Sequence, residues 1–93
     1  MRTIRFAARY KKDYLRQKSG VLAKNFDCRL RVVVSMLQAD QPLPERFRDH
    51  PLSGEWKDYR DCHAFPDLVL IYRKPDDNGL ELVRLGSHSD LSL

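Results

Sequence analysis

Residues 68–72, with the sequence LVLIY, constrain the fold of this 93-residue chain more than any other segment. Five consecutive apolar residues that follow Pro66 are typical of a strand buried on both faces. Such a strand needs hydrogen-bonded neighbours at its edges and apolar cover on each side. The rest of the chain must therefore supply further strands and a covering layer.

Three other segments have the alternating pattern of strands: residues 3–7, 56–65 and 80–88. The sequence Asp76-Asp77-Asn78-Gly79 precedes the last of them. It predicts a hairpin with a primed turn, because Asn-Gly accepts the positive backbone angles of such turns. Residues 41–55 contain two X-Pro pairs, a His-Pro and a Ser-Gly, and predict a surface loop.

Two helices are expected between the first strand and this loop. Tyr10 and Tyr14 lie four residues apart, and Ser19-Gly20 is a plausible end of the first helix. Residues 21–39 form the longest periodic segment, with an apolar face made by Phe26, Leu30, Val33 and Leu37. The order predicts one α+β domain over residues 1–93, with a mainly antiparallel four-stranded sheet and both helices on one face.

Composition narrows the class of protein. The chain is 42% hydrophobic and 32% charged, as in soluble globular domains, and its net charge is +4. The positive charge favours an acidic partner, with nucleic acid first. We find no apolar run of about 18 residues and no signal peptide, so we expect a cytoplasmic protein without membrane contact. Cys28 and Cys62 lack Cys-x-x-Cys spacing, which argues against a zinc knuckle and for free thiols.

The three histidines belong to separate segments that the sheet can bring together. His50 lies in the predicted loop, and His63 and Asp67 flank one predicted hairpin turn. His88 ends the last strand, which runs parallel to the one that carries His63. If the last three strands form a meander, these four groups converge at one end of the sheet.

Imidazoles with a carboxylate suit either a metal site or acid-base catalysis. A metal site would be better supported by a close pair such as His-x-x-x-His, which is missing, so we rank proton transfer higher. Proton transfer beside cations fits cleavage of RNA by its own 2′-hydroxyl. The candidates for RNA contact are Arg84, Arg60, Lys57, Lys11 and Lys12.

Each of these residues also has a plain structural interpretation. His50 before Pro51 and Asp67 after Pro66 are both typical of turns. Arg60 suits an ion pair with a neighbouring aspartate, and Lys11 and Lys12 suit a solvated helix face. Residue types alone therefore leave the catalytic and the structural interpretations open.

Longer motifs add a resemblance to a known family. The run His-Pro-Leu-x-Gly-x-Trp-Lys-x-Tyr-Arg-Asp-x-His, the Pro-Asp before the apolar strand, and Gly-Ser-His near the end resemble the YafQ branch of the RelE/ParE toxin superfamily. The resemblance implies a RelE-like microbial ribonuclease fold. It also implies a toxin that enters the A site of the 70S ribosome and cuts messenger RNA, with a preference for adenine-rich lysine codons.

The resemblance implies partners and residue roles as well. A DinJ/RelB-like antitoxin would neutralise the toxin, and operator DNA would be bound only through their complex. No metal or other cofactor is implied. The catalytic residues would be His50, His63, Asp67 and His88, with Arg84 facing the phosphate. His88 would be the general acid, His50 or Asp67 the base, and His63 an orienting group.

Two positions depart from the family pattern, and two other functions remain. Leu68 and Ser92 stand where the family has aromatic residues, and we expect both changes to weaken stacking on codon bases. One alternative is a ParE-like gyrase inhibitor of the same fold that lacks catalysis. The other is a basic RNA-binding module in which the histidines are structural.

Overall fold

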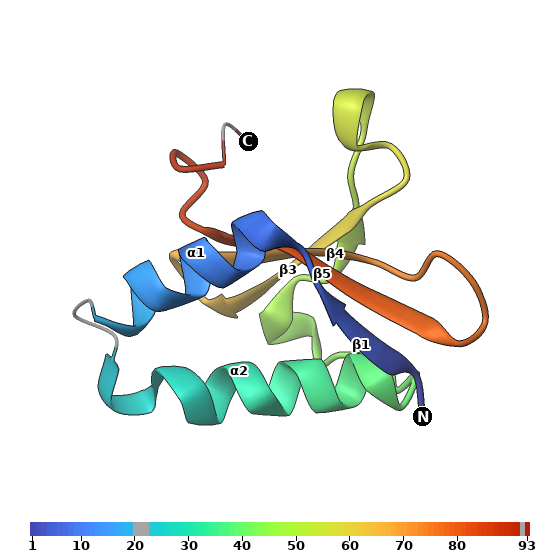
Figure 1. The fold of residues 1–93 in the computed structure, drawn as a ribbon, viewed down its shortest axis with the longest axis horizontal. Coiled ribbons are helices and arrows are strands. Elements are labelled where there is room, and N and C mark those ends of the chain that lie inside the picture. Colours follow the sequence, from blue (N-terminus) through green and yellow to red (C-terminus); the bar gives the residue numbers. More distant parts are fainter. Residues whose placement is uncertain (20–22, 92) are drawn as a thin grey trace.

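The computed structural model describes residues 1–19, 23–91 and 93. Its elements in chain order are β1 (Thr3–Phe6), α1 (Ala8–Lys18), α2 (Ala23–Gln38), η1 (Glu45–Phe47), β2 (His50–Pro51), η2 (Gly54–Trp56), β3 (Arg60–Phe65), β4 (Leu68–Arg73) and β5 (Gly79–Gly86). Figure 1 shows the two helices together on one side of a twisted sheet. The predicted helix end at Gly20 and helix start at Val21 lie outside the described residues.

The sheet has five strands in the order β1-β5-β4-β3-β2. Only β1 and β5 pair in parallel, and the other neighbours are antiparallel, so the predicted α+β fold is confirmed. The fifth strand is β2, which lies inside the predicted loop and pairs with β3. Two residues are too few to show alternation, and Pro51 is tolerated because β2 is an edge strand.

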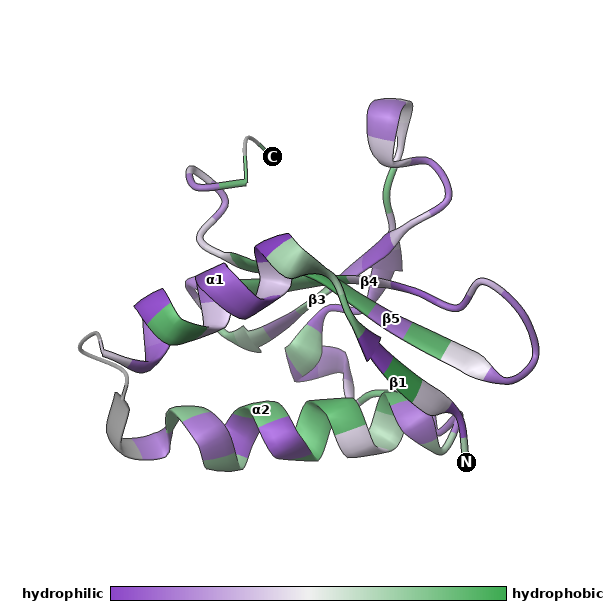
Figure 2. Ribbon diagram, viewed as in Figure 1, coloured by the Kyte–Doolittle hydropathy of each residue, from purple (hydrophilic) through white to green (hydrophobic). Residues whose placement is uncertain are grey.

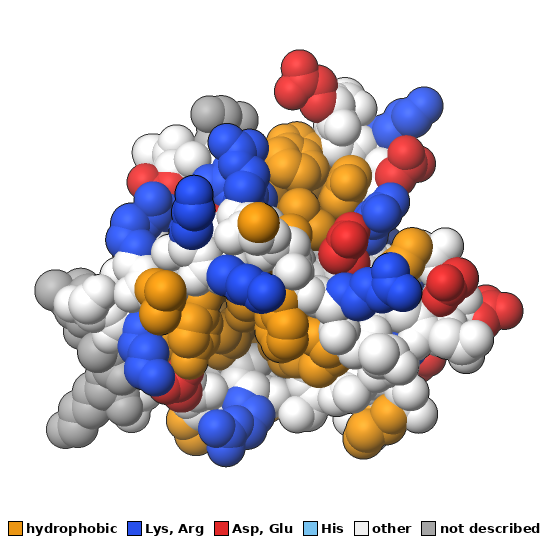
Figure 3. All heavy atoms as spheres, in the orientation of Figure 1, with side chains coloured by type: hydrophobic (Ala, Val, Ile, Leu, Met, Phe, Trp, Pro, Cys, Tyr) orange, Lys and Arg blue, Asp and Glu red, His pale blue; other side chains and the backbone are white. Residues whose placement is uncertain are grey.

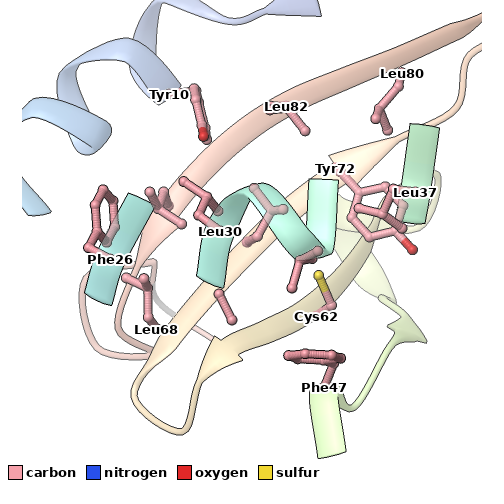
Figure 4. Close-up of a cluster of buried hydrophobic side chains, with 14 residues drawn as sticks. Tyr10, Phe26, Leu30, Leu37, Phe47, Cys62, Leu68, Tyr72, Leu80 and Leu82 are labelled. Carbon is pink, nitrogen blue, oxygen red and sulfur yellow. The ribbon is translucent and has the colours of Figure 1, made fainter. Parts of the chain in front are cut away.

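The main core lies between the helices and the sheet, as Figure 4 shows. The apolar face predicted for α2 is confirmed, because all four of its residues are at most 5% exposed. Along α2, apolar residues alternate with polar ones in Figure 2, as expected for a helix that is half covered. Strand β4 contributes Leu68, Leu70 and Tyr72 to this core.

A smaller core covers the opposite face of the sheet. Val69 and Ile71 of β4 pack there against Leu91 near the C-terminus, with the partly buried Trp56 and Tyr59 beside them. Strand β4 is therefore buried on both faces, as its continuous apolar run predicts. Among the described residues, every helix is too short or too polar to span a bilayer.

The predicted strand over residues 56–65 begins four residues late. Gly54 has φ of +66°, which favours glycine, and it starts the 3-10 helix η2 that ends at Trp56. The amide of Tyr59 then donates to the carbonyl of Trp56 at 2.9 Å and closes a further turn. Alternation of residue types continues through these turns, so the pattern alone does not locate the start of β3.

The hairpin between β4 and β5 is confirmed, but the primed turn is wrong. Neither Asn78 nor Gly79 has a positive φ. Instead, Oδ1 of Asp76 accepts hydrogen bonds from the amides of Asn78 at 2.9 Å and Gly79 at 2.7 Å. A side chain that caps backbone donors in this way replaces the two-residue turn.

Strand β5 departs from the simple alternation predicted for residues 80–88. Tyr72 pairs with Leu82 while Ile71 pairs with Arg84, so Val83 is an extra residue in a bulge. The bulge returns Leu85 to the core that holds Leu80 and Leu82. The strand also ends at Gly86, and His88 therefore lies in the turn that follows it.

Candidate functional site

His50 and Asp61 face each other across the strands at one edge of the sheet. Their residues are directly opposed in the antiparallel pair β2 and β3, so their side chains share a face. Nε2 of His50 lies 2.7 Å from Oδ1 of Asp61. Nδ1 lies 3.1 Å from the carbonyl oxygen of Pro51, which can only accept. Nδ1 therefore carries a hydrogen that it donates to this carbonyl, and Nε2 faces the carboxylate of Asp61.

Asp61 is a buried carboxylate, with only 1% of the residue exposed. Burial raises its pKa, and positive charge on His50, His63 and His88 acts in the opposite direction. Among the described residues, Oδ1 of Asp61 has no hydrogen bond of regular geometry, and its ion pair is with His50. A negative charge at this point attracts positive charge nearby.

His63 follows Asp61 by two residues on β3 and so lies on the same face. One side-chain donor atom from each of His50, Asp61 and His63 lies within 4.8 Å of the others. The rings of His63 and His88 have their centroids 5.0 Å apart. The predicted convergence of the three histidines therefore agrees with the structure, and Asp61 lies at its centre.

The register of the sheet explains how His88 reaches this place. Val69 pairs with His63 on one side and with Gly86 on the other. The chain then turns back, with the amide of Leu91 donating to the carbonyl of Ser87 at 3.1 Å. A Cβ atom on Gly86 would lie 3.1 Å from Cβ of Asp90, so glycine leaves room for the turn that carries His88.

Asp67 lies in the exposed turn between β3 and β4, at the end of β3 that carries His63. Within the described ranges its carboxylate has no side-chain hydrogen bond or ion pair. The structure thus places Asp67 in the turn beyond His63, and among the described residues its carboxylate is not part of the cluster formed by His50, Asp61 and His63.

The expectation that Leu68 weakens stacking on codon bases is wrong. Leu68 is 1% exposed and belongs to the core between the helices and the sheet, where Figure 4 shows it. An RNA base cannot stack on a side chain in that position. The matching expectation for Ser92 falls outside the described residues.

Arg84 is held by a carboxylate that the sequence did not single out. Its Nε donates to Oδ2 of Asp13 at 2.7 Å, and the amide of Leu85 donates to the same oxygen at 3.0 Å. Strand β1 ends at Phe6, opposite Leu82, so at Leu85 strand β5 has a neighbour only on its β4 side. Asp13, which is 4% exposed, takes over that position and orients the arginine.

A polar hollow of about 550 Å³ opens beside Arg84. It is lined by Arg9, Glu55, Trp56, Arg84, Asp90 and Leu91. A second hollow, of about 620 Å³, is lined by Glu45, Arg46, Arg48, Asp49 and His50. Two arginines line each hollow together with two acidic residues, and these arginines are candidates for contact with the phosphates of an RNA strand.

Arg60 belongs to the other face of the sheet. Its Nε donates to Oδ1 of Asp49 at 3.2 Å, and the same oxygen accepts from the hydroxyl of Tyr72 at 2.5 Å. Residues that alternate along β3 point to opposite faces, so Arg60 points away from the face of Asp61 and His63. The structure gives Arg60 an ion-pairing role and does not bring it to the histidines.

The three predicted lysines lie on the surface. Lys11 and Lys12 are exposed on α1, and Lys57 is exposed after η2. Figure 3 shows lysine and arginine side chains gathered over the α1 side of the molecule. These positions suit contact with phosphates, while the described residues place none of the three in the histidine cluster.

Sequence reasoning missed two residues that organise the site, Asp61 and Asp13. A signal existed for Asp61, since it alternates with His63 on the same side of a predicted strand. Its pairing with His50 was hidden because β2 is so short. Nothing in the spacing of Asp13 within a basic helix indicates that it holds Arg84, 71 residues away.

The match to a family model decides what kind of protein this is. Residues 2–93 match the model described as a bacterial toxin of type II toxin-antitoxin systems, YafQ. The chain belongs to the YafQ toxin family. The resemblance stated from the sequence motifs is therefore confirmed over nearly the whole chain.

Individual YafQ relatives agree with this. The mRNA interferase toxin YafQ of Escherichia coli is 38% identical over 91 residues, which cover 97% of this chain and 95% of the relative. A copper-bound mutant toxin from Helicobacter pylori has a TM-score of 0.84 at 38% identity, over 98% and 99% of the two chains. The E. coli DinJ-YafQ complex contains a chain with a TM-score of 0.78 at 32% identity, with 98% of each chain covered.

Proposed function

We propose that this YafQ-family toxin cleaves messenger RNA in the ribosomal A site by metal-independent acid-base catalysis. The observation that carries the proposal is the convergence of His50, His63 and His88 on the buried Asp61. A structural role for the histidines explains this less well, because two of them keep exposed surface next to a buried carboxylate.

The reaction requires two proton transfers and one phosphorus-centred substitution. A base removes the proton from a 2′-hydroxyl, and that oxygen attacks the adjacent phosphorus. The bond from phosphorus to the 5′-oxygen breaks, and an acid protonates the leaving oxygen. The products are a 2′,3′-cyclic phosphate and a 5′-hydroxyl, so no oxidant, reductant or water is consumed in the step.

The positions of the side chains support distinct roles. His88 is exposed and lies next to His63, which suits it to give a proton to the leaving oxygen. Both ring nitrogens of His50 have neighbours, whereas the exposed carboxylate of Asp67 has none among the described residues. This contrast favours Asp67 as the base and His50 as the group that holds Asp61.

Arg84 supplies fixed positive charge for the phosphate. Its guanidinium is anchored through Nε by Asp13 and lines the polar hollow beside the C-terminal turn. A preorganised cation stabilises charge that grows on the phosphate oxygens in the transition state. Its side chain is 15% exposed, which leaves part of it open to a ligand.

Metal plays no part in the proposed cleavage. A related Helicobacter pylori toxin is known in a copper-bound form, and the donor atoms of this chain are of the type that such ions prefer. The chemistry nevertheless needs only a base, an acid and a cation, since RNA carries its own nucleophile. The three histidines, Asp67 and Arg84 provide all three functions.

Expression in bacteria, with message ends mapped codon by codon, tests the proposal. We expect in-frame cuts with the wild-type chain and their loss with His88→Ala. Cys28→Ser, which changes an exposed residue on α2, serves as the matched control and should keep the cuts. Growth arrest with intact messages would contradict the proposal and support inhibition of gyrase.

Dependence on the ribosome can be tested separately with purified components. We expect the toxin to cut free RNA poorly, because the residues around the histidines include few aromatic side chains that could hold a strand. The ribosome would instead present the codon in position. Rapid cleavage of naked RNA at the same sites would contradict this part of the proposal.

The antitoxin is the proposed protein partner, as DinJ is for YafQ in the E. coli complex. An apolar groove of about 460 Å³ on α1 suits it, lined by Phe6, Tyr10, Lys11, Tyr14 and Leu15. In Figure 3 hydrophobic side chains gather on this face between basic ones. Leu15 is 66% exposed, and we expect Leu15→Glu to weaken capture by an apolar, acidic antitoxin segment while Val32→Glu on α2 does not.

A further inference from the structure

We propose that Arg48 holds a phosphate of the messenger RNA next to the one that is cleaved, and so positions the strand at the histidine cluster. The inference rests on the proposed cleavage of RNA at that cluster. Three features of Arg48 carry it. They are the conformation of its backbone, the lack of a partner for its guanidinium among the described residues, and its place in the hollow beside His50.

Arg48 has a backbone conformation that arginine rarely adopts. Its φ of 49° and ψ of 47° lie in the left-handed region. Helices commonly end on a residue in this conformation, but that residue is usually glycine or asparagine, because a Cβ atom makes the conformation costly. Arg48 ends η1 in this way, and its amide donates to the carbonyl of Glu45 at 2.9 Å. Glycine would serve this turn better, so the arginine side chain needs another explanation.

Packing on both sides of Arg48 enforces this conformation. Phe47 before it is 2% exposed, and Figure 4 shows its ring within the core cluster. Asp49 after it accepts hydrogen bonds from Nε of Arg60 at 3.2 Å and from the hydroxyl of Tyr72 at 2.5 Å. An unfavourable backbone conformation persists where the surrounding structure fixes it. The base of the Arg48 side chain is therefore held in a defined place.

Only one other described residue besides glycine has a positive φ, and its side chain has structural partners. This residue is Asp40, whose Oδ1 accepts from Nε of Arg2 and from Nζ of Lys74, both at 2.7 Å. Aspartate also tolerates the left-handed region better than arginine does. Arg48 is exposed, and within the described ranges its guanidinium has no hydrogen bond, ion pair or aromatic partner. A structural role thus explains Asp40 and leaves the guanidinium of Arg48 available to a ligand.

The hollow of about 620 Å³ places this cation beside the site, since Arg48 and His50 both line it. The other arginine of the hollow, Arg46, lies over the ring of Phe47, with its guanidinium carbon 4.8 Å from the ring centroid. The carboxylate of Asp49 is already engaged on the other face of the sheet. Of the two arginines in this hollow, Arg48 is the one that a phosphate can meet without breaking an existing contact.

The role of Arg48 differs from that of Arg84. The two hollows share no lining residue, and Arg84 belongs to the one beside the C-terminal turn. An RNA strand carries one phosphate per nucleotide, so a strand that fills both hollows meets the two arginines at different phosphates. The planar guanidinium can donate two parallel hydrogen bonds to such a phosphate. A contact of this kind fixes the register of the strand and does not read its sequence.

Steady-state cleavage on programmed ribosomes tests the contact. We expect Arg48→Gly to lower kcat/KM roughly fivefold to tenfold and mainly through KM, because the contact is as strong before the reaction as during it. A plot of log kcat/KM against log KCl concentration should lose about 0.7 of its slope, the value for one phosphate of a single strand. Arg31→Gln removes one charge from the exposed surface of α2 and should change neither quantity. An unchanged KM and slope in Arg48→Gly would overturn the proposal.

Messages with one uncharged linkage identify the phosphate. A methylphosphonate replaces either of the two phosphates that flank the cleaved one, on a 2′-deoxy nucleotide that carries an ordinary phosphate in the reference message. We expect one of the two replacements to slow the wild type as much as Arg48→Gly does, and to have little further effect on that variant. Losses that are equal in both proteins, or a wild type that neither replacement slows, would overturn the contact.

Stability separates this positioning role from a structural one. Glycine accepts a positive φ, so Arg48→Gly should unfold at a urea concentration no lower than the wild type does. Arg48→Lys keeps the charge and should recover most of the lost kcat/KM. A lower urea midpoint in Arg48→Gly, with no recovery in Arg48→Lys, would show that the arginine serves the fold and would overturn the proposal.

Binding without cleavage separates this contact from the proposed chemistry. Ribosomes that hold a message with a 2′-O-methyl group at the cut site lack the nucleophile, and we expect the Kd of Arg48→Gly for them to rise by the same factor as KM. A wild type that binds these ribosomes and leaves ordinary messages uncut would contradict the proposed function, while weaker binding by Arg48→Gly would still support the contact. Equal Kd values for the two proteins would overturn the contact whether or not RNA is cut.

Discussion

Asp13 and Arg84 are 71 residues apart in sequence, yet Oδ2 of the first lies 2.7 Å from Nε of the second. The same carboxylate accepts the amide of Leu85, just beyond the point where β1 leaves the sheet. One buried side chain thus completes the hydrogen bonding of β5 and holds the cation proposed to meet the phosphate. Stability and function should therefore be coupled at this pair.

A double-mutant cycle on the pair measures that coupling. We expect Asp13→Asn and Arg84→Gln each to lower the free energy of unfolding by roughly 1 to 3 kcal/mol, as for charged hydrogen bonds. The double variant should lose about 1 kcal/mol less than the sum, because each change removes the same contact. Urea denaturation measures all four proteins, and strictly additive losses would show that the contact contributes nothing.

The effect of pH on stability should reveal the buried charge of Asp61. Burial raises its pKa, so the folded state keeps the proton to a higher pH than the unfolded state does. The contribution of Asp61 to the free energy of unfolding is therefore most favourable at a pH below its pKa in the unfolded state. That contribution declines as the pH rises through its pKa in the folded state. Asn at position 61 cannot ionise and avoids this decline.

We accordingly expect the free energy of unfolding of Asp61→Asn to gain on that of the wild type as the pH rises above the ordinary pKa of an aspartate, about 3.9, because the pKa of Asp61 is raised above that value. Urea denaturation at several pH values measures the difference. The variant should also lose cleavage, since it removes the charge that faces the histidines. If the wild type instead became the more stable of the two proteins as pH rises, the attraction between Asp61 and its histidine partners would outweigh the cost of its burial.

The opposite face of the sheet offers a matched control. Tyr72→Phe removes only the hydroxyl that donates to Asp49, in a residue that is 1% exposed. We expect it to cost roughly 1.5 to 3 kcal/mol of unfolding free energy, the usual net value of a hydrogen bond to a charged group. Cleavage by the folded variant should equal that of the wild type. A loss of activity as large as in Asp61→Asn would show that both faces serve the reaction.

Leu68 tests whether the position after Pro-Asp reads the codon in this protein. Its side chain is fully packed between the helices and the sheet, so Leu68→Tyr should overpack the core and cost about 1 to 3 kcal/mol. The cut sites mapped in messages should not change. Altered sites without a loss of stability would mean that the side chain reaches the RNA.

Much of the fold was predictable because its signals are local. The apolar run of β4 and the four-residue spacing along α2 each follow from one short stretch, and both predictions are confirmed. The strand β2 and the bulge at Val83 were not predictable, because each is defined by a partner strand. Alternation continues through such features without a break.

The candidate site, like the fold, was predictable only in part. The convergence of His50, His63 and His88 follows from the order of strands in a meander and was expected. The central place of Asp61 was not, because it depends on the cross-strand register with His50. The prediction that Leu68 affects stacking on codon bases failed for a related reason, since a residue beside a functional turn can still point into the core.

The rate of message cleavage on programmed ribosomes, measured against pH with wild type and His88→Gln, tests the central claim most directly. A transition-metal chelator is present while Mg²⁺ is kept for the ribosome. We predict a bell-shaped profile for the wild type, insensitive to the chelator, and loss of the limb that reports the general acid in the variant. Cleavage that the chelator abolishes, or that His88→Gln leaves unchanged, would contradict proton transfer by the histidine cluster.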